Sequence, residues 1–427
     1  MYGRLVGKRI TGHFFVSHIA AGGMECCDYL LACDMEMDPV AGYRIASWDK
    51  GYGDMHAVPD LSTLRVASWL ERTAIVLCDL FRSRGADPIE VAPRTILRRQ
   101  LDRAARRGLV VKAGSELEFF LLKQSYEEAR ARHFVGLEPL GWYVEDYHAL
   151  QGTREEPIVG RIRRAMDASG VPVEFSKGEW GPGQHEINLR YAEMLEMADR
   201  HVLYKHAAKE IAIEAGRALT FMAKLDERWA GNSLHIHTSL WDSSGERALF
   251  AEREEGGYPE IFEHYLAGLL AHARELTLWF APNVNSYKRF VAGSFAPTAV
   301  AWAVDNRTAG FRVVGRGDSL RVECRIPGAD ANPYLAMAAI VAAGLDGIDR
   351  KLELPPPVEG NAYECRTAPR VPGTLEEALE LFRGSDFTEA AFGAEVVAHY
   401  ARFAEVELEK FRGAVTGWER ERFLERG

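Results

Sequence analysis

The sequence predicts an α+β protein in two parts, a small N-terminal domain over residues 1–95 and a larger domain over residues 96–427. Short strand-like runs separated by Gly, Asp and Pro fill the first part. In the second part, strand-like runs alternate with long helical segments. Residues 83–95, SRGADPIEVAPRT, have the composition of a linker between them. A chain of 427 residues is long enough for one small and one large domain.

In chain order, the first predicted strands are HFFVSHI at 13–19 and YLLACDMEM at 29–37. An amphipathic helix with a solvated basic face is predicted for 93–108, PRTILRRQLDRAARRG. GSELEFFLL at 114–122 is predicted to be a buried strand. The aromatic, turn-rich stretch 132–157 predicts a long loop over a site or a subunit edge.

Further along, residues 194–222 predict a long helix, because its apolar residues near the end share one face. Two later strands are expected in GNSLHIHTSL at 231–240 and SLRVECRIPG at 319–328. The longest apolar run, residues 334–345, is too short and too Ala-rich to span a bilayer, so we expect a buried helix there.

Composition narrows the class of protein. Hydrophobic residues make up 47% of the chain and charged residues 27%, as in ordinary globular enzymes. The net charge of −10 disfavours nucleic acid as a partner, because phosphate backbones require clustered Lys and Arg. Six cysteines without paired spacing suggest reduced thiols. The start MYGRLVGKRI lacks the features of a signal peptide, so we expect a cytoplasmic protein that does not bind a membrane.

Paired polar residues recur on the predicted strands of the larger part. Glu116 and Glu118 lie two apart, as do His235 and His237, and Glu323 lies two residues before Arg325. Residues two apart on a strand point to the same side. A Gly-Pro-Gly turn separates Glu179 from Glu186 and can bring these two carboxylates together. If the strands are adjacent, five carboxylates and two imidazoles converge in one cavity.

Such a cavity requires cations. A site rich in carboxylates suits Mg²⁺ or Mn²⁺ better than Zn²⁺, whose structural sites are tetrahedral and rich in sulfur and nitrogen. A divalent ion would turn the repulsion between Glu116 and Glu118 into attraction and keep both ionised. Any one pair taken alone is equally consistent with an exposed strand face or a salt bridge, so the metal prediction depends on the four features together.

Basic residues that suit an anion follow in the second half of the chain. They are Lys288, Arg289, Arg307, Arg312, Arg321 and Arg325. Arginine binds carboxylate and phosphate through two parallel hydrogen bonds. The chain has no G-x-x-x-x-G-K-[ST] loop, so a bound nucleotide would be held by metals and arginines. Each arginine alone would be interpreted as a surface or structural residue.

Six motifs together resemble the glutamine synthetase family. They are GSELEFFLL, GPGQHEINLRY, GNSLHIHTSL, NSYKRFVAGSFAP, NRTAGFRVVG and RVECRIPGADANPYLAMAA, in the family's order and at similar distances. The resemblance implies an N-terminal β-grasp domain and a catalytic domain whose antiparallel strands form half of an active-site barrel. It also implies a stacked-ring homo-oligomer, expected to be a dodecamer, in which the neighbour's N-terminal domain completes each site.

The resemblance assigns roles to individual residues. Glu118, Glu179 and Glu186 match the ligands of one metal, and Glu116, His235 and Glu323 match those of a second, so that two to three Mg²⁺ or Mn²⁺ ions are expected per site. Tyr191, His237, Ser239, Arg312 and Arg321 match nucleotide contacts. Gly231, Arg289 and Arg325 match the glutamate site, and Arg307 matches a phosphate-binding arginine, as do Arg312 and Arg321. Arg289 and Arg307 are the expected catalytic arginines.

The implied chemistry is the ATP-dependent joining of glutamate to an amine. ATP phosphorylates the γ-carboxylate, and the amine then displaces phosphate. The flap is VAGSFAP at 291–297, and glutamine-forming members carry a glutamate there where this chain has Phe295. They also carry an N-terminal aspartate where this chain has Ala41. Without these acids for ammonium, and with Tyr43 beside Ala41, the pocket is predicted to be apolar and to take an organic monoamine. The expected product is a γ-glutamyl amide.

Two alternatives remain open at this point. The chain could be an ordinary glutamine synthetase in which another acid, Asp49 or Asp54, binds ammonium. It could also be a non-catalytic, metabolite-sensing paralogue, although a sensor has no need of six metal ligands. Tyr363 falls where some bacterial members are adenylylated, but its flanking residues differ, so we interpret it as a structural tyrosine.

Overall fold

The computed structural model describes residues 1–251 and 257–427. Its centre is an eight-stranded sheet, counted over that part of the chain, in the order β11-β12-β13-β10-β6-β8-β7, with β9 also paired to β6. The strands are β6 (Leu109–Leu122), β7 (Val173–Gly178), β8 (Gln184–Glu193), β9 (Ala218–Thr220), β10 (Leu234–Asp242), β11 (Trp302–Val304), β12 (Phe311–Val314) and β13 (Arg321–Cys324). All described pairs are antiparallel except β11 with β12.

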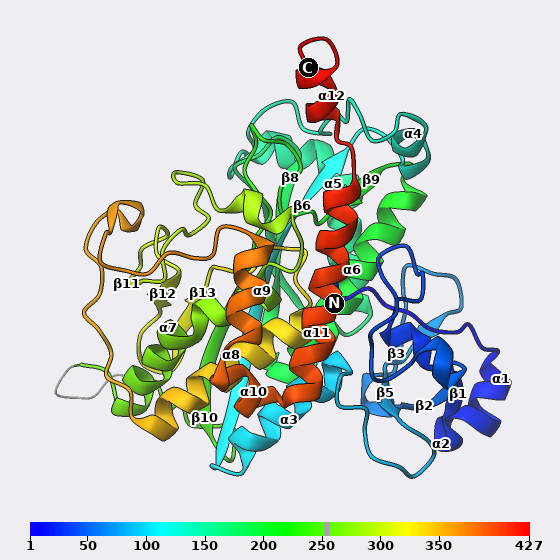
Figure 1. Ribbon diagram of the computed structural model, residues 1–427, viewed down its shortest axis with the longest axis horizontal. Coiled ribbons are helices and arrows are strands. Elements are labelled where there is room, and N and C mark those ends of the chain that lie inside the picture. Colours follow the sequence, from blue (N-terminus) through cyan, green and yellow to red (C-terminus); the bar gives the residue numbers. More distant parts are fainter. Residues whose placement is uncertain (252–256) are drawn as a thin grey trace.

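Helices cover the sheet in layers. Helices α3, α5 and α6 pack directly on its strands, and α8 packs on α3, α6 and α7. The helices of the larger part are α3 (Pro93–Ala105), α4 (Tyr126–Ala131), α5 (Ala149–Ala168), α6 (Met194–Glu214), α7 (Glu260–Phe280), α8 (Pro333–Arg350), α9 (Leu375–Arg383), α10 (Asp386–Phe392), α11 (Ala394–Gly413) and α12 (Gly417–Phe423). Figure 1 shows α12 projecting from the rest, next to the C-terminus.

Helix α8 contains the long apolar run, and its residues from Pro333 to Leu345 are buried, as predicted. It approaches α7 closely because glycines face each other: a Cβ on Gly268 would lie 2.1 Å from the Ala343 carbonyl oxygen, and one on Gly347 would lie 2.1 Å from that of His264. No larger residue fits either position without moving a backbone.

The first part of the chain, blue in Figure 1, lies beside the larger part. It contains a sheet of β1 (Met24–Cys27), β2 (Asp54–Pro59) and β5 (Cys78–Phe81), and a two-stranded pair of β3 (Arg65–Val66) and β4 (Ala74–Ile75). The predicted α+β class, with a small N-terminal sheet and a large antiparallel one, is confirmed. The boundary near residue 95 stays a prediction.

Two predicted N-terminal strands are wrong. Residues 13–19 fall in a short helical segment made of α1 (Gly12–Phe14), a π-helical turn (Phe15–Ile19) and α2 (Ala20–Gly22). Residues 29–37 begin in a 3₁₀ turn (Asp28–Leu31). In 13–19 only Ile19 is buried, so the apolar run has no core to face, and local helical hydrogen bonds satisfy the backbone in place of a sheet partner.

Two boundaries in the larger part also differ from the prediction. Helix α5 begins at Ala149, inside the stretch predicted as a loop, and holds Pro157 in its interior. Pro157 removes one backbone hydrogen bond, and the burial of Ile158 and the contact of the buried Glu155 with His185 hold this part of the helix. Helix α6 ends at Glu214 and the chain reverses at Gly216, where φ is +66°, so the end of the predicted helix is instead strand β9.

A network around Arg94 on α3 joins the two parts. Its guanidinium pairs with Asp60 (2.8 Å) and Asp79 (2.6 Å), both from the N-terminal part, and with Asp199 of α6 (2.8 Å). Arg94 and Asp199 are buried, and the Tyr334 hydroxyl donates to Asp199 (2.6 Å). The network therefore fixes the N-terminal sheet against α3 and α6.

This network predicts a loss of stability in acid. Burial opposes ionisation of Asp60, but hydrogen bonds from Ser62 and Arg94 lower its pKa to about 2. The folded pKa is below the unfolded value of about 3.9, so Asp60 stabilises the fold above pH 4 and loses that contribution as the pH falls towards 2. We expect Asp60→Asn to flatten the dependence of unfolding free energy on pH between 4 and 2, measured by urea titration. An unchanged slope would contradict this.

Within the described residues, each helix is too short or too polar to cross a membrane.

Candidate active site

The register of the central sheet places the predicted site residues directly opposite one another. On β6 and β10, Glu116 pairs with His235. On β6 and β8, Glu118 pairs with Glu186. On β10 and β13, His237 pairs with Glu323. Opposed residues in an antiparallel pair point to the same face, so the acids and imidazoles form one continuous site across four strands.

The first cluster contains Glu118, Glu179 and Glu186, each offering a carboxylate oxygen within 4.8 Å of the others. Glu179 follows the end of β7 and pairs with Lys177. The Ser233 amide donates to Glu118 (2.7 Å). Burial, and then the charge of Glu179, raises the pKa of Glu118 to about 8. Burial and the neighbouring carboxylates also raise the pKa of Glu186.

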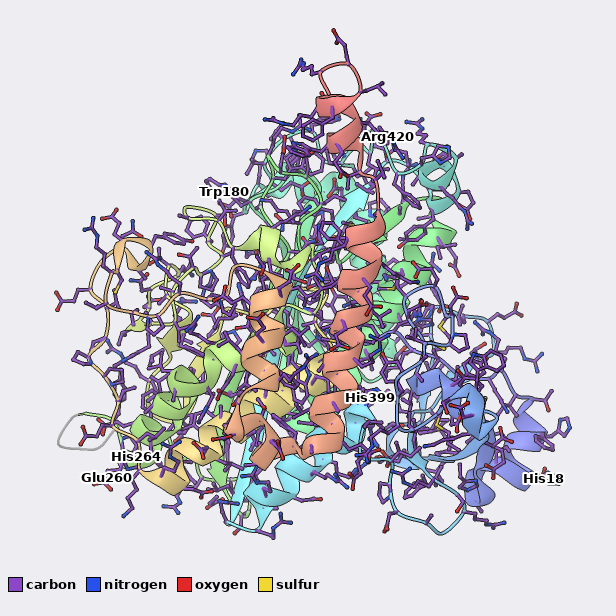
Figure 2. All side chains as sticks on the ribbon, in the orientation of Figure 1. His18, Trp180, Glu260, His264, His399 and Arg420 are labelled. Carbon is purple, nitrogen blue, oxygen red and sulfur yellow. The ribbon has the colours of Figure 1, made fainter. Side chains whose placement is uncertain are left out.

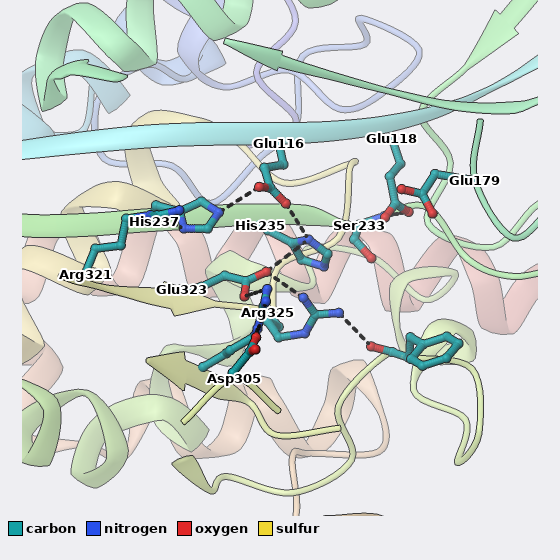
Figure 3. A network of polar contacts seen from close by, with 12 residues as sticks. Glu116, Glu118, Glu179, Ser233, His235, His237, Asp305, Arg321, Glu323 and Arg325 are labelled. Atoms are coloured by element: carbon teal, nitrogen blue, oxygen red, sulfur yellow. Dashed lines mark hydrogen bonds and ion pairs between the residues drawn. The ribbon is translucent and has the colours of Figure 1, made fainter. Parts of the chain in front are cut away.

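The second cluster, shown in Figure 3, contains Glu116, His235, His237 and Glu323. His235 Nδ1 lies 3.2 Å from Glu116 and 3.4 Å from Glu323, and His237 Nε2 lies 2.9 Å from Glu116. Burial opposes ionisation of Glu116, but His237 and His235 lower its pKa. Glu323 is 0% exposed, and although burial opposes its ionisation too, Arg325 lowers its pKa to about 2.

These donor sets fit divalent cations. The first cluster is made of oxygen only, and the second of oxygen with imidazole, which matches the preferences of Mg²⁺ and Mn²⁺. The pKa values of Glu118 and Glu186 are raised because these carboxylates are buried with too little positive charge near them. A divalent ion would supply that charge. The buried Nε2 of His235 has no hydrogen-bond partner among the described residues. The sequence predicted that His237 contacts the nucleotide, and the structure places it in the second cluster with Glu116 and Glu323.

Three predicted arginines approach this cluster. Arg325 lies 2.5 Å and Arg312 lies 3.1 Å from Glu323, and Arg321 donates to His237 Nδ1 (3.2 Å). Arg312 also pairs with Asp305. This part of the site therefore holds fixed positive charge beside carboxylates, an arrangement that can bind both metal ions and the phosphates that accompany them.

The other two arginines are placed differently. Arg289 is buried, and its guanidinium donates to the carbonyls of Ile326 (2.8 Å) and Arg325 (2.8 Å) and to Ser233. Burial lowers its pKa to about 10. Arg307 is exposed. The Arg289 guanidinium thus points at backbone carbonyls. The predicted roles of Arg289 at glutamate and of Arg307 at the phosphates stay predictions.

Gly231 lies against Arg289. A Cβ at this position would be 2.6 Å from Arg289 Cγ and 2.5 Å from the Ala223 carbonyl oxygen, so only glycine fits. The Gly231 carbonyl accepts from Gln184 (3.0 Å), which also donates to Glu118 (3.3 Å). Gly231 is therefore connected to the first cluster through one side chain.

Two predicted nucleotide contacts lie farther along the strands. Tyr191 on β8 is exposed, with the Lys112 ammonium 6.0 Å from its ring centre. Ser239 on β10 accepts from Trp241 Nε1 (2.9 Å). Lys112 also lies 3.6 Å from the Trp241 ring. The exposed ring of Tyr191 has a face available for stacking, which suits its predicted role.

The three predicted amine-pocket residues do not meet within one chain. Phe295 lies in the flap, 44% exposed, with φ at +59°. Tyr43 is buried with its ring 4.7 Å from that of His399, and the Ala41 carbonyl accepts from Arg402 (3.1 Å), both on α11. Figure 2 shows His399 well apart from Trp180, whose ring contacts Phe295.

Several residues of the site were missed by the sequence analysis. Lys177 neutralises Glu179, Gln184 and Ser233 hold Glu118, and Trp180 contacts the flap. Lys177 had a visible signal, since it lies two residues before Glu179 in the sequence and so on the same side of a strand. The contacts of Ser233 and Trp180 depend on distant segments and had no such signal.

Comparisons with known proteins agree over most of the chain. The catalytic domain of glutamine synthetase matches residues 90–423. A γ-glutamylethanolamide synthetase of Streptomyces coelicolor is 51% identical over 426 residues, covering 100% of this chain and 91% of the relative. A glutamate–isopropylamine ligase of Pseudomonas sp. is 37% identical over 422 residues, covering 98% and 92%. The solved structure of apo GmaS without ligand matches with a TM-score of 0.81 at 29% identity, covering 95% and 90%.

Proposed function

The chain belongs to the glutamine synthetase family, and from this premise we propose that it joins the γ-carboxylate of glutamate to an organic monoamine at the expense of ATP. The sequence-based prediction of an ATP-dependent carbon–nitrogen ligase that uses an organic amine agrees with the activities named for the two relatives. Enzymes of this family generally depend on a divalent metal and ATP. The observation that carries the choice of amine is the apolar Phe295 in the flap, packed against Trp180.

The reaction has two steps. An oxygen of the γ-carboxylate attacks the terminal phosphorus of ATP, the bond to the bridging oxygen breaks, and ADP leaves. The amine nitrogen then attacks the acyl carbon of γ-glutamyl phosphate, phosphate leaves, and the nitrogen loses a proton. Two steps are needed because direct condensation of a carboxylate with an amine is uphill in water.

Glu118, Glu179 and Glu186 would hold one Mg²⁺ or Mn²⁺ ion, and Glu116, His235 and Glu323 a second. His237 offers a nitrogen within 4.8 Å of ligand oxygens of Glu116 and Glu323, so it would be a further ligand of the second ion. Bound divalent ions supply charge that offsets the negative charge of the phosphates during transfer. Lys177, Gln184 and the Ser233 amide orient the carboxylates of the first cluster.

Positive side chains would bind the two anionic substrates. Arg312, Arg321 and Arg325 already surround the second cluster, where they suit phosphates and the glutamate carboxylates. Arg307 is exposed, and we assign it to a phosphate from the resemblance alone. Arg289 would act on glutamate through Ser233 and the Arg325 carbonyl, which it holds.

A stacked-ring oligomer would complete the amine side. Ala41 and Tyr43 contact α11 of their own chain, so a neighbour's N-terminal part would have to approach Phe295. We propose that the assembly is a dodecamer, and its mass in solution tests this.

The choice of amine is tested by restoring the acid in the flap. We expect Phe295→Glu to lower the preference for ethanolamine or isopropylamine over ammonium by about 10-fold or more, because a carboxylate attracts ammonium and removes apolar surface from the pocket. Phosphate release from ATP with glutamate and each amine, with products identified by mass, measures this. Val291→Glu, an exposed apolar position in the same flap, is the matched control.

The same assay separates the alternatives. A wild-type enzyme that turns over only ammonium is an ordinary glutamine synthetase, and one that releases no phosphate with any amine is a sensor. If Phe295→Glu leaves the amine preference unchanged in an enzyme that makes γ-glutamyl amides, the role of Phe295 is wrong.

A further inference from the structure

Trp180 has no assigned role in the reaction described above, yet it lies between a proposed metal ligand, Glu179, and the flap ring of Phe295. It follows Glu179 directly, in the turn that joins β7 to β8, and its side chain is 51% exposed. Its ring centre is 5.9 Å from that of Phe295, with the planes at 75°. This edge-to-face contact joins the turn that carries a proposed metal ligand to the flap.

Hydrogen bonds and packing against β6 fix the turn that carries Trp180. The Gly183 amide donates to the buried Glu145 carboxylate (2.9 Å), and the Asp146 amide donates to the Glu179 carbonyl (3.0 Å). A Cβ on Gly181 would lie 2.7 Å from the Phe120 ring, so the turn packs directly on β6. The indole therefore projects from a well-supported backbone.

The flap is also attached to the site. Arg325, which pairs with Glu323, donates to the Phe295 carbonyl (3.4 Å). The Ser294 hydroxyl donates to the Val291 carbonyl (2.6 Å) and closes the turn of the flap. Two aromatic rings from separate elements are thus each anchored to a different cluster of the site, and both keep about half of their surface exposed.

We propose that Trp180 is a specificity-determining residue for the amine, forming with Phe295 an apolar wall that contacts the carbon substituent on the reacting nitrogen. This inference rests on the proposed function and deepens it. Exposed aromatic surface beside a reaction centre binds alkyl groups by the area removed from water, and one methylene in such a pocket changes selectivity by about 10- to 200-fold.

The charges next to Trp180 favour a neutral substituent. The carboxylate of Glu179 is paired with the Lys177 ammonium, which also lies 4.6 Å from the Tyr147 ring. Glu179 therefore offers little to a second ammonium group, and Lys177 repels one. The wall fits a short monoamine with an alkyl or hydroxyalkyl group better than a diamine.

The test is the steady-state kinetics of Trp180→Ala with ethanolamine, isopropylamine, putrescine and ammonium. We expect KM for the two monoamines to rise about 10-fold or more, with kcat, KM for ammonium and KM for glutamate and ATP changed less than about threefold. Trp180→Phe, which keeps an aromatic ring, should recover most of the monoamine affinity. Trp418→Ala, at an exposed tryptophan on α12 that stacks on Arg422, should behave like wild type.

Three other results would contradict either the role of Trp180 or the proposed function. If wild type makes γ-glutamyl amides but Trp180→Ala changes KM for monoamines and for ammonium equally, the specificity role is wrong. If KM for glutamate or ATP rises in proportion, Trp180 acts by placing Glu179, and the inference also fails. If wild type makes no γ-glutamyl amide, the proposed function itself is wrong and the inference falls with it.

Discussion

Replacing Glu118 with Gln is expected to lower activity by more than about 100-fold. Losing a group that only orients a metal ligand costs about 10- to 100-fold, and Glu118 is a proposed ligand itself. The carboxylate lies within 4.8 Å of Glu179 and Glu186 and would be shared with a divalent ion. Gln keeps the size and the hydrogen bond from the Ser233 amide but loses the charge. Phosphate release from ATP measures the loss, and Glu127→Gln, at an exposed position on α4, is the control.

The same substitution has the opposite effect on the metal-free fold. Burial raises the pKa of Glu118 to about 8, well above its unfolded value of about 4.3. Its contribution to stability is therefore complete below pH 4 and is lost as the pH rises through 8. Without metal, we expect the stability of Glu118→Gln relative to wild type to increase between pH 4 and pH 8, measured by thermal unfolding in chelator.

Adding metal should reverse the order. A ligand at 100 times its Kd stabilises the protein that binds it by about 2.7 kcal/mol. We expect Mn²⁺ or Mg²⁺ to raise the unfolding temperature of wild type and to do so much less for Glu118→Gln. If both proteins gain equally, Glu118 is not a metal ligand.

Arg94→Met is expected to destabilise the protein by about 3–5 kcal/mol, because it leaves the buried Asp199 carboxylate without its counterion, while Asp60 and Asp79 keep only Arg98. Asp199 is buried and both Asp60 and Asp79 pair with the same guanidinium. Methionine fills similar space, so the loss reports charge more than volume. Urea unfolding at pH 7 measures it.

Arg99→Met on the same helix is the matched control. Arg99 pairs with Glu90 (3.0 Å), but both side chains are 43% exposed, and such a pair contributes about 0–1 kcal/mol. Equal destabilisation by the two substitutions would contradict the view that the Arg94 network joins the two parts of the chain. A separate early transition in Arg94→Met would further indicate that the N-terminal part unfolds first.

The placement of the site residues was predicted correctly where the prediction depended only on residues close together in the sequence. Glu116 and Glu118, and His235 and His237, share a face because strand side chains alternate, and this follows from the spacing alone. The prediction failed where local patterns were ambiguous. Residues 13–19 are apolar enough for a strand, but no neighbouring strand pairs with them among the described residues, and they fold as a helical turn.

Other features needed contacts between distant segments. Arg289 lies in the motif NSYKRFVAGSFAP and was predicted to bind glutamate, yet its guanidinium lies against the carbonyls of Arg325 and Ile326. No sequence pattern indicates a role for Trp180. Its proposed role depends on contact with the ring of Phe295, 115 residues later in the chain. Such contacts carry no local signal.

The sequence by itself determined which strands carry the acids and imidazoles and which side of each strand they share, because the pleat repeats every two residues. It also determined the family, through six motifs in order. Only the tertiary structure decided that β6 lies between β8 and β10, which sets Glu118 opposite Glu186 and Glu116 opposite His235. Strand order depends on hydrogen bonds and packing between residues far apart in the chain, and these form only when the whole core assembles.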